Sequence, residues 1–283
     1  MPAAELPPGP VDTGPVDTDP GDTDPGDTGP AIAGPVAIGP VAIGVTNRPV
    51  TVAEIAALLA AKAAPGTVLL VGVTGSVAGG KSTFVAALQA ALATTHRTEA
   101  ISTDGFLLPN ATLTARDLNL RKGFPETYDA EALFGAIAQA RTGPTVFPGY
   151  SHITYDPDPA HARTVDRPDI LILEGLGFAP MPDGRTARDH VDVLIYLDAA
   201  EEDLETWFVR RFLGFWRAAE TDPASFYAQF RTMSETEAEG FARMIWQRIN
   251  LANLRAHIVH TRDTAHVLLR KAHDHTLTLV RSA

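Results

Sequence analysis

The 283-residue chain has a net charge of −11, a hydrophobic content of 45% and no cysteine. The lack of cysteine excludes disulfides, zinc–thiolate sites and cysteine nucleophiles, and the apolar runs are too short to cross a membrane. The length fits one large α/β domain or two small ones. Because the N-terminus has no basic and apolar signal-peptide pattern, we expect a cytoplasmic protein.

The negative charge is concentrated near the N-terminus. Residues 1–45 contain one glutamate and six aspartates but no lysine or arginine, so the remainder of the chain is only mildly acidic. The sequence has no basic stripe that would attract a polyanion. We therefore expect no nucleic-acid partner and no membrane partner.

A proline repeat with a period of five residues begins at Val11 (VDTGP, VDTDP, GDTDP, GDTGP, AIAGP, VAIGP). Proline at every fifth position is incompatible with a regular helix or a central strand. The acidic half has too little apolar surface to offset the entropy of ordering, and its aspartates lack the spacing of a calcium-binding loop. We therefore predict a disordered Pro/Asp/Gly repeat arm over residues 1–48 and a folded domain over residues 49–283.

The folded domain begins with a predicted helix, a strand and a glycine-rich loop. Thr51 can cap a helix that extends to Ala63, and the apolar run Thr67–Val73 predicts a buried strand. The next residues fit G-x-x-x-x-G-K-[ST] without mismatch, and a helix is predicted over Lys81–Leu92. A strand, a glycine-rich loop and a helix in this order predict a phosphate-binding loop (P-loop), formed by Gly75, Ser76, Val77, Ala78, Gly79, Gly80, Lys81, Ser82 and Thr83.

The P-loop predicts that the protein binds ATP with Mg²⁺. The backbone N–H groups of the loop and the N-terminal end of the following helix would surround the phosphates. Lys81 would contact the β and γ phosphates, and Ser82 would be a ligand of Mg²⁺.

Strands and helices alternate in the rest of the chain. Apolar runs predict strands ending at Thr103, Leu173, Leu197 and Leu269, and Pro144–Tyr155 is expected to be irregular. Helices are predicted within Glu126–Arg141, over Glu201–Ala219, from Asp222-Pro223, and from the capping box Ser234-x-x-Glu237 to about His257. This alternation predicts an α/β fold with a doubly wound, mostly parallel sheet and helices on both faces. Ligands of such sheets bind at the carboxyl ends of the strands.

Three carboxylates follow predicted strands: Asp104, Glu174 and Asp198. An aspartate at such a position could accept the proton of an alcohol that attacks the γ phosphate, and an acidic group there could hold Mg²⁺ or its water ligands. Each of the three could instead cap the next helix or turn. Position in the sequence alone does not separate them.

Phosphoryl transfer also requires cations near the transferred group. Arg210 and Arg211 in the aromatic-rich helix, and the pair Arg121-Lys122, are the candidate suppliers, although each could equally lie on a solvated face. The pair His273-x-His275 has no third metal ligand at a suitable spacing. We therefore expect no histidine-based metal site.

Motifs outside the P-loop resemble those of bacterial type I pantothenate kinase, which is grouped with uridine kinase and phosphoribulokinase among the P-loop small-molecule kinases. The resemblance extends from about Val71 to the C-terminus. Its ordered motifs are Thr-Asp-Gly-Phe-Leu (103–107), Lys-Gly-Phe-Pro-Glu-Thr-Tyr-Asp (122–129), Tyr-Ser-His-Ile-Thr-Tyr-Asp (150–156), Pro-Asp-Ile-Leu-Ile-Leu-Glu-Gly-Leu (168–176) and Asn-Leu-Ala-Asn (250–253).

The resemblance implies that residues 49–283 form a P-loop kinase domain that uses ATP and Mg²⁺. The expected reaction converts pantothenate to 4′-phosphopantothenate at its primary hydroxyl, the first step of coenzyme A biosynthesis. Asp104 matches the family's catalytic aspartate, Arg211 an arginine near the transferred phosphate, and Glu174 a strand-end glutamate that would hold Mg²⁺ with Ser82. Lys271 and His275 match residues that border the nucleotide. The other matches line the substrate pocket: Lys122, Tyr150, His152, Tyr155, Asn250 and Asn253.

The sequence departs from the family pattern at several positions. Phe208 replaces a substrate-binding tyrosine, Gly177 replaces an asparagine and Leu108 replaces a histidine, so a kinase acting on another small alcohol (pantoate, a nucleoside or a sugar) is the alternative function. The family is homodimeric and is inhibited by coenzyme A, and we expect the same dimer. Ala86 stands where an arginine is common in the family. We expect this change and the repeat arm to affect inhibition by coenzyme A.

Two readings without catalysis are weaker. A nucleotide-dependent switch predicts a guanine-reading Asn-Lys-x-Asp motif, which the sequence lacks. A pseudokinase predicts loss of the reactive residues, whereas Lys81, Ser82 and Asp104 are all present.

Overall fold

The computed structural model describes residues 44–282, and most of the predicted repeat arm therefore lies outside the described residues. The first strand, β1 (Gly44–Val50), contains the predicted boundary between arm and domain after residue 48. That boundary is wrong, because residues 44–48 pair with the C-terminal strand of the domain. The local sequence did not predict this pairing, because the partner residues lie more than two hundred positions away in the chain.

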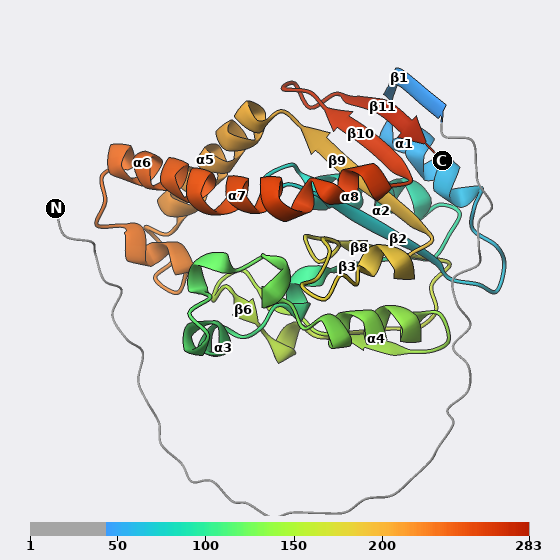
Figure 1. The fold of residues 1–283 in the computed structure, drawn as a ribbon, viewed down its shortest axis with the longest axis horizontal. Helices are drawn as coiled ribbons and strands as arrows, with labels where there is room; N and C mark the ends of the chain where they lie inside the picture. Colours follow the sequence, from blue (N-terminus) through green and yellow to red (C-terminus); the bar gives the residue numbers. More distant parts are fainter. Residues whose placement is uncertain (1–43, 283) are drawn as a thin grey trace, which may run out of the picture. The chain divides into compact units, whose positions relative to one another are not determined.

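A seven-stranded sheet forms the centre of the domain, in the order β1-β11-β10-β9-β2-β8-β3 (Figure 1). The five strands from β10 to β3 are parallel, whereas β1 and β11 are antiparallel to their neighbours at one edge. The parallel strands are β2 (Leu69–Gly75), β3 (Thr98–Ser102), β8 (Ile170–Glu174), β9 (Val193–Ala199) and β10 (Val267–Lys271), and β11 spans Leu277–Ser282. The predicted α/β fold with a mostly parallel sheet is confirmed, and the antiparallel edge was not predicted.

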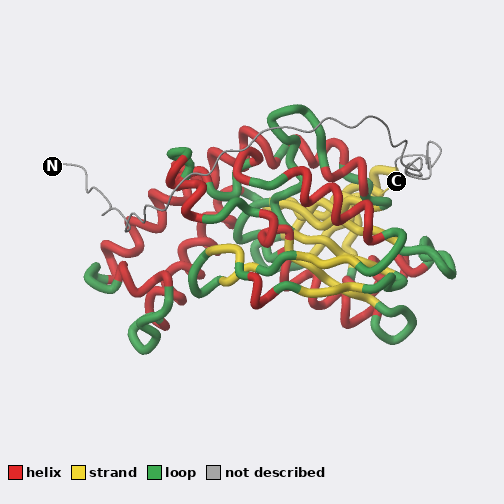
Figure 2. The backbone as a smooth tube through the Cα atoms, turned by 90° about the horizontal axis from the view of Figure 1, so that it is seen from below, coloured by secondary structure: helices red, strands yellow, loops and turns green. Residues whose placement is uncertain are grey.

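Helices cover both faces of this sheet, as Figure 2 shows. On one face α1 (Val52–Ala60) and α2 (Lys81–Leu92) bury Leu59 and Leu88 against the odd-numbered side of β2, which includes Val71. On the other face α4 (Ala130–Ala140) and the C-terminal helices pack against Leu70. Alternation of apolar residues on β2 thus supplies both cores, as expected for a strand buried on both sides.

Two of the predicted helix caps are confirmed and one is wrong. Thr51 caps α1 and Ser234 caps α6 (Glu235–Ile245), and each is completed as a capping box by the glutamate three residues later. The helix predicted from Asp222-Pro223 is wrong. Asp222 and Ser225 cap successive tight turns instead, and only a 3-10 helix over Phe226–Phe230 forms, which packs against α5 (Glu201–Ala218).

The long C-terminal helix is interrupted twice by π turns. After α6 the chain continues through a π turn at Trp246–Asn250, α7 (Leu251–Asn253), a second π turn at Leu254–Ile258 and α8 (His260–Thr264). Single π turns within helices often occur at functional sites. Asn250 of the Asn-Leu-Ala-Asn motif is the last residue of the first π turn, and Asn253 directly precedes the second.

Short elements complete the described chain. They are α3 (Asn110–Ala115), β4 (Thr145–Phe147) paired with β7 (Arg163–Val165), and β5 (Tyr150–Ser151) paired with β6 (Asp156–Pro157). Pro144–Tyr155, predicted to be irregular, therefore contains two short strands. Within residues 44–282, every helix is too short or too polar to span a bilayer.

Candidate active site

The P-loop joins the end of β2 to the start of α2, in the order of strand, loop and helix that the sequence predicted. Gly80 precedes α2 with φ of +86°, and Gly75 ends β2 with φ of +141°, both in the region that favours glycine. A Cβ on Gly75 would lie 2.3 Å from the Leu197 carbonyl oxygen, and one on Gly80 would lie 2.5 Å from Lys271 Nζ. Glycine at these two positions therefore leaves room for backbone and lysine to approach the loop.

Lys81 folds back over the P-loop. Its Nζ donates hydrogen bonds to the carbonyl oxygens of Gly75 at 3.2 Å and Ser76 at 3.0 Å. Burial lowers the pKa of Lys81, and the charge of Arg211 lowers it further, while Glu174 and Asp104 act in the opposite direction. Lys81 thus lies within range of two carboxylates and a second cation.

The Ser76 side chain provides a further polar group in the loop. Its Oγ is buried and has no hydrogen-bond partner among residues 44–282. A buried hydroxyl without a partner is costly, and a phosphate oxygen at the loop would satisfy it. The loop therefore fits a nucleotide phosphate.

Ser82 and Glu174 are in direct contact at the carboxyl edge of the sheet. Ser82 Oγ donates a 2.9 Å hydrogen bond to Glu174 Oε1, which joins the first turn of α2 to the end of β8. A hydroxyl and a carboxylate are oxygen ligands of the kind that Mg²⁺ prefers, with phosphate and water oxygens completing its shell. Within the described part of the chain no three His, Asp or Glu side chains converge on one point, so a metal there would depend on those phosphate and water oxygens.

Asp104 lies at the same edge of the sheet, just beyond β3. Because β3 and β8 are adjacent and Ser102 is in register with Glu174, the two strand-end carboxylates meet at one edge of the sheet. Burial raises the pKa of Asp104, and the Glu174 charge raises it further, against opposing effects of Lys81, His152 and Lys122. This environment disfavours the carboxylate, which increases its tendency to take up a proton.

Asp198, the third strand-end carboxylate, has a cationic partner of its own. It lies at the end of β9 and pairs with Arg270 at 3.6 Å. Arg270 lies opposite it in the parallel register between β9 and β10. Strand order thus brings Asp104 and Glu174 together at one edge of the sheet, whereas Asp198 pairs with an arginine.

Lys122 lies within interaction range of Asp104. Its Nζ donates to Asn110 Oδ1 at 2.6 Å and to the Tyr155 carbonyl oxygen, and lies 3.8 Å from Asp156. Burial lowers the pKa of Lys122, while Asp156 and Asp104 act to raise it. Asn110 and Asp156 were not predicted as site residues, since nothing in their local sequence indicates that they position a lysine.

A cluster of aromatic rings lies next to this lysine. Tyr150, His152 and Tyr155 contact one another edge to face, with centroid distances of 5.2 to 6.3 Å, and Lys122 Nζ lies 5.2 Å from the Tyr150 ring centre. The three residues predicted from the Tyr-Ser-His-x-x-Tyr motif are thus brought together. Tyr155 has φ of +56°, an unusual backbone conformation for a tyrosine.

Tyr155 also contacts aromatic residues that pack against α5. Its Oη lies 2.8 Å from Tyr227 Oη, and its ring stacks on Phe226 at 4.6 Å. Tyr227 was not predicted, because its segment was assigned to a helix with no polar motif. Phe208 packs beside Trp246, with ring centres 5.8 Å apart.

The two motif asparagines lie at the π turns. Asn253 is 3% exposed, and its Nδ2 donates to the Gly123 carbonyl oxygen at 2.8 Å, next to Lys122. Its Oδ1 has no partner within the described residues. Asn250 is half-buried three residues earlier. One amide oxygen at this site is therefore free to accept a hydrogen bond.

The nucleotide-bordering candidates lie on the other side of the P-loop. Lys271 Nζ donates to the Gly79 carbonyl oxygen at 3.1 Å and lies 4.6 Å from the Trp207 ring centre. The Trp207 ring is 4.9 Å from that of His275. Arg211 is exposed one helical turn beyond Trp207 on α5. Trp207 was not predicted as a site residue, since an apolar helix position is more often part of a core.

Comparison with known proteins shows that the chain is similar to small-molecule kinases. Residues 70–211 match the phosphoribulokinase/uridine kinase family. The chain is 42% identical over 214 residues to the pantothenate kinase of Streptococcus equi subsp. zooepidemicus, covering 74% of this chain and 70% of the relative. It is 44% identical over 222 residues to that of Streptomyces avermitilis, covering 74% and 68%.

Solved structures agree on the fold. A protein provisionally assigned as a fructose transport system kinase, from a Silicibacter species, aligns with a TM-score of 0.60 and 27% identity over 73% of this chain and 93% of its own. The D-glycerate 3-kinase of Cryptococcus neoformans var. grubii aligns with a TM-score of 0.53 and 15% identity over 80% and 96%. Both similarities support the P-loop kinase architecture.

Proposed function

The chain belongs to the type I pantothenate kinases of the phosphoribulokinase/uridine kinase family, and on that premise we propose that it phosphorylates pantothenate. ATP would supply the γ-phosphoryl group, and the primary hydroxyl of pantothenate would receive it, which is the first step of coenzyme A biosynthesis. The supporting observation is that Lys81, Asp104 and Glu174 lie within interaction range at the carboxyl edge of the sheet.

Asp104 is proposed as the catalytic base. The environment that raises its pKa gives its carboxylate an affinity for the hydroxyl proton as that oxygen bonds to phosphorus. Lys81 and the P-loop amides would hold the β and γ phosphates, and Arg211 would offset the charge on the transferred group. Positioning and charge compensation are the main contributions of a protein to this reaction.

Mg²⁺ is proposed to bind at Ser82 and Glu174. When bound, the ion would neutralise charge on the phosphate oxygens. The 2.9 Å contact between the two side chains holds them together at the loop. Ser82 lies in the first turn of α2, directly after the P-loop, so a metal ion bound there would lie next to the nucleotide phosphates.

The substrate pocket is proposed to be the aromatic cluster next to Asp104. Tyr150, His152 and Tyr155 would line it, Lys122 would supply positive charge, and Asn250 with the free Oδ1 of Asn253 would supply polar contacts. Phe208 would contribute apolar surface only. Lys271 and His275, with Trp207 between them, would border the base of the nucleotide.

ADP release measures this activity directly. Purified protein is supplied with Mg²⁺-ATP and, in parallel, pantothenate, pantoate, uridine or ribulose 5-phosphate, with Asp104→Asn as the control. We expect turnover on pantothenate that the control lacks. Turnover on another alcohol would instead support the alternative that Phe208 and Gly177 define a changed pocket, and turnover on none would contradict both.

The family resemblance also supports proposals on assembly and regulation. We propose a cytoplasmic homodimer, which sedimentation analysis of the purified protein would test. Coenzyme A is the proposed feedback inhibitor, and because Ala86 is exposed on α2 where an arginine is common, we expect weak inhibition. Inhibition assays with and without residues 1–43 would separate the effects of Ala86 and of the repeat arm.

A further inference from the structure

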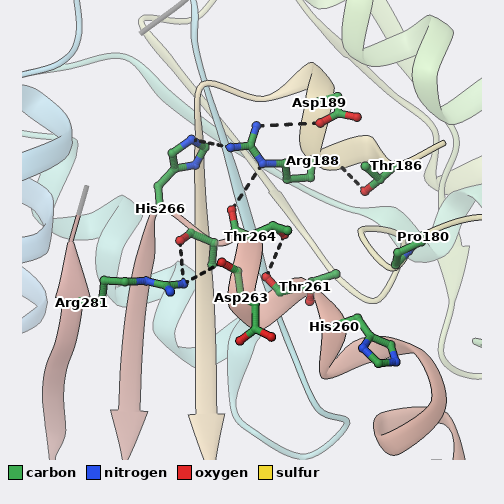
Figure 3. Close-up of a pocket in the computed structure, with 11 residues that line it drawn as sticks. Pro180, Thr186, Arg188, Asp189, His260, Thr261, Asp263, Thr264, His266 and Arg281 are labelled. Atoms are coloured by element: carbon green, nitrogen blue, oxygen red, sulfur yellow. Dashed lines mark hydrogen bonds and ion pairs between the residues drawn. The ribbon is translucent and has the colours of Figure 1, made fainter. Parts of the chain in front are cut away.

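A cavity of about 410 Å³ lies at the edge of the sheet opposite to the P-loop. Figure 3 shows the residues that line it. Thr186, Arg188 and Asp189 precede β9, and residues 260–266 precede β10, whereas the P-loop follows β2. Because these strands are parallel, their amino ends form the edge opposite to the active site. None of the proposed catalytic or substrate residues lines this cavity.

His266 has a defined proton position in this cavity. The Leu194 amide donates a 2.8 Å hydrogen bond to Nδ1 of the ring. Burial and the charges of Arg188 and Lys62 lower the pKa of His266 to about 4, against an opposing effect of Asp192, so the ring is neutral at physiological pH. A neutral imidazole has one donor and one acceptor nitrogen. Since Nδ1 accepts, Nε2 holds the proton and is a donor.

Arg188 faces that donor directly. Its Nη2 lies 3.0 Å from His266 Nε2, as the dashed line in Figure 3 marks. A guanidinium has only donors, so two N–H groups point at each other and neither can satisfy the other. The remaining contacts of Arg188 are weak: 3.4 Å to the Thr264 carbonyl oxygen and 3.9 Å to Asp189, whose side chain is 67% exposed. Arg188 Nη2 and His266 Nε2 are therefore two adjacent donors that lack a shared hydrogen-bond acceptor.

We propose that this cavity binds a small oxyanion whose oxygens accept hydrogen bonds from Arg188 Nη2 and His266 Nε2. A neutral acceptor would satisfy the two donors equally well, but Arg188 and Lys62 place a positive potential at the ring, which favours an anion. Arg281 adds a second guanidinium to the wall, where its Nη2 donates to the carbonyl oxygens of Arg262 and Ala265. The wall also contains the carboxylates of Asp189 and Asp263, whose side chains are 67% and 81% exposed, so solvent screens their charges more than that of Arg188, which is 30% exposed. This site is independent of the phosphoryl-transfer chemistry proposed above.

The experiment uses the full chain labelled with ¹⁵N-histidine and inorganic phosphate as the probe, with sodium chloride at matched ionic strength as the reference. The His266 ring resonances are identified by their loss in His266→Asn, whose side-chain oxygen can still accept from the Leu194 amide. We expect a saturable phosphate-dependent shift of Nε2 in the millimolar range. Phosphate bound at the P-loop does not affect this readout, because that loop lies at the other edge of the sheet.

Two arginine variants decide the specificity. Arg188→Gln is expected to weaken phosphate binding at least tenfold, and Arg188→Lys, which keeps the charge without the planar fork, to weaken it less. Arg217→Gln removes an equal charge from an exposed pair with Glu235 and is expected to leave the shift unchanged. Absence of a saturable shift in the wild type, or an unchanged shift in Arg188→Gln, would overturn the proposal. A parallel ADP-release assay tests the proposed function separately.

Discussion

Ser82 Oγ and Glu174 Oε1 lie 2.9 Å apart, which joins the first turn of the phosphate-binding helix to the end of a strand 92 residues later. Glu174 also acts on Asp104, whose pKa it raises. One carboxylate therefore links the proposed metal position to the proposed base. This dual role distinguishes Glu174 from a carboxylate that only caps a turn.

Glu174→Gln should affect both Mg²⁺ use and pH dependence. Loss of the charge weakens metal binding, so the Mg²⁺ concentration for half-maximal rate should rise several-fold. Loss of the same charge lowers the pKa of Asp104, so the acid limb of the kcat/KM profile should move to lower pH. Asp198→Asn, at a neighbouring strand end, is the matched control, and an equal effect there would contradict this assignment.

Asp104→Asn should abolish activity and yet stabilise the fold. Loss of a general base costs roughly 10²–10⁴-fold in rate. Burial and Glu174 raise the pKa of Asp104 in the folded state, so the folded state binds more protons than the unfolded state between the two pKa values. The contribution of this group to stability therefore falls as pH rises through that window. Thermal denaturation should give a higher Tm for the variant at neutral pH, with a smaller gain in acid.

Gly80→Ala should impair nucleotide binding. The added Cβ would lie 2.5 Å from Lys271 Nζ, and the residue would have to keep φ of +86°, which costs a non-glycine residue about 1–2 kcal/mol. We expect a higher KM for ATP and a lower Tm. Gly214→Ala in α5 has no atom within 4 Å of the added Cβ and should instead stabilise the protein by about 0.5–1 kcal/mol. Equal behaviour of the two variants would contradict a specific role for Gly80.

Phe208→Tyr should improve pantothenate binding. The added hydroxyl would restore the hydrogen bond that the family pattern includes, worth about 0.5–1.5 kcal/mol or up to roughly tenfold in affinity. The KM for pantothenate should fall while the KM for ATP stays constant. Phe215→Tyr, at a position 46% exposed on the same helix, is the control. A rise in the KM for pantothenate would show that Phe208 fits a different substrate.

Local sequence determined the P-loop and most of the elements around it. The loop follows from a motif in which strand, glycines, lysine and helix are contiguous, and α2 has the predicted bounds because its apolar spacing and its position after Gly80 are local properties. The same holds for the capping boxes at Thr51 and Ser234. Each depends on interactions within a few residues, which a sequence displays directly.

Tertiary structure decided the features that depend on distant partners. Strand order places Glu174 beside Asp104 and pairs Asp198 with Arg270, and no local pattern contains that order. The antiparallel edge and the contact of Tyr227 with Tyr155 join residues 72 to more than 200 positions apart. Hydrogen bonding and packing across the sheet thus gave the three strand-end carboxylates different surroundings, because a side chain acquires its charge environment only when the chain has folded around it.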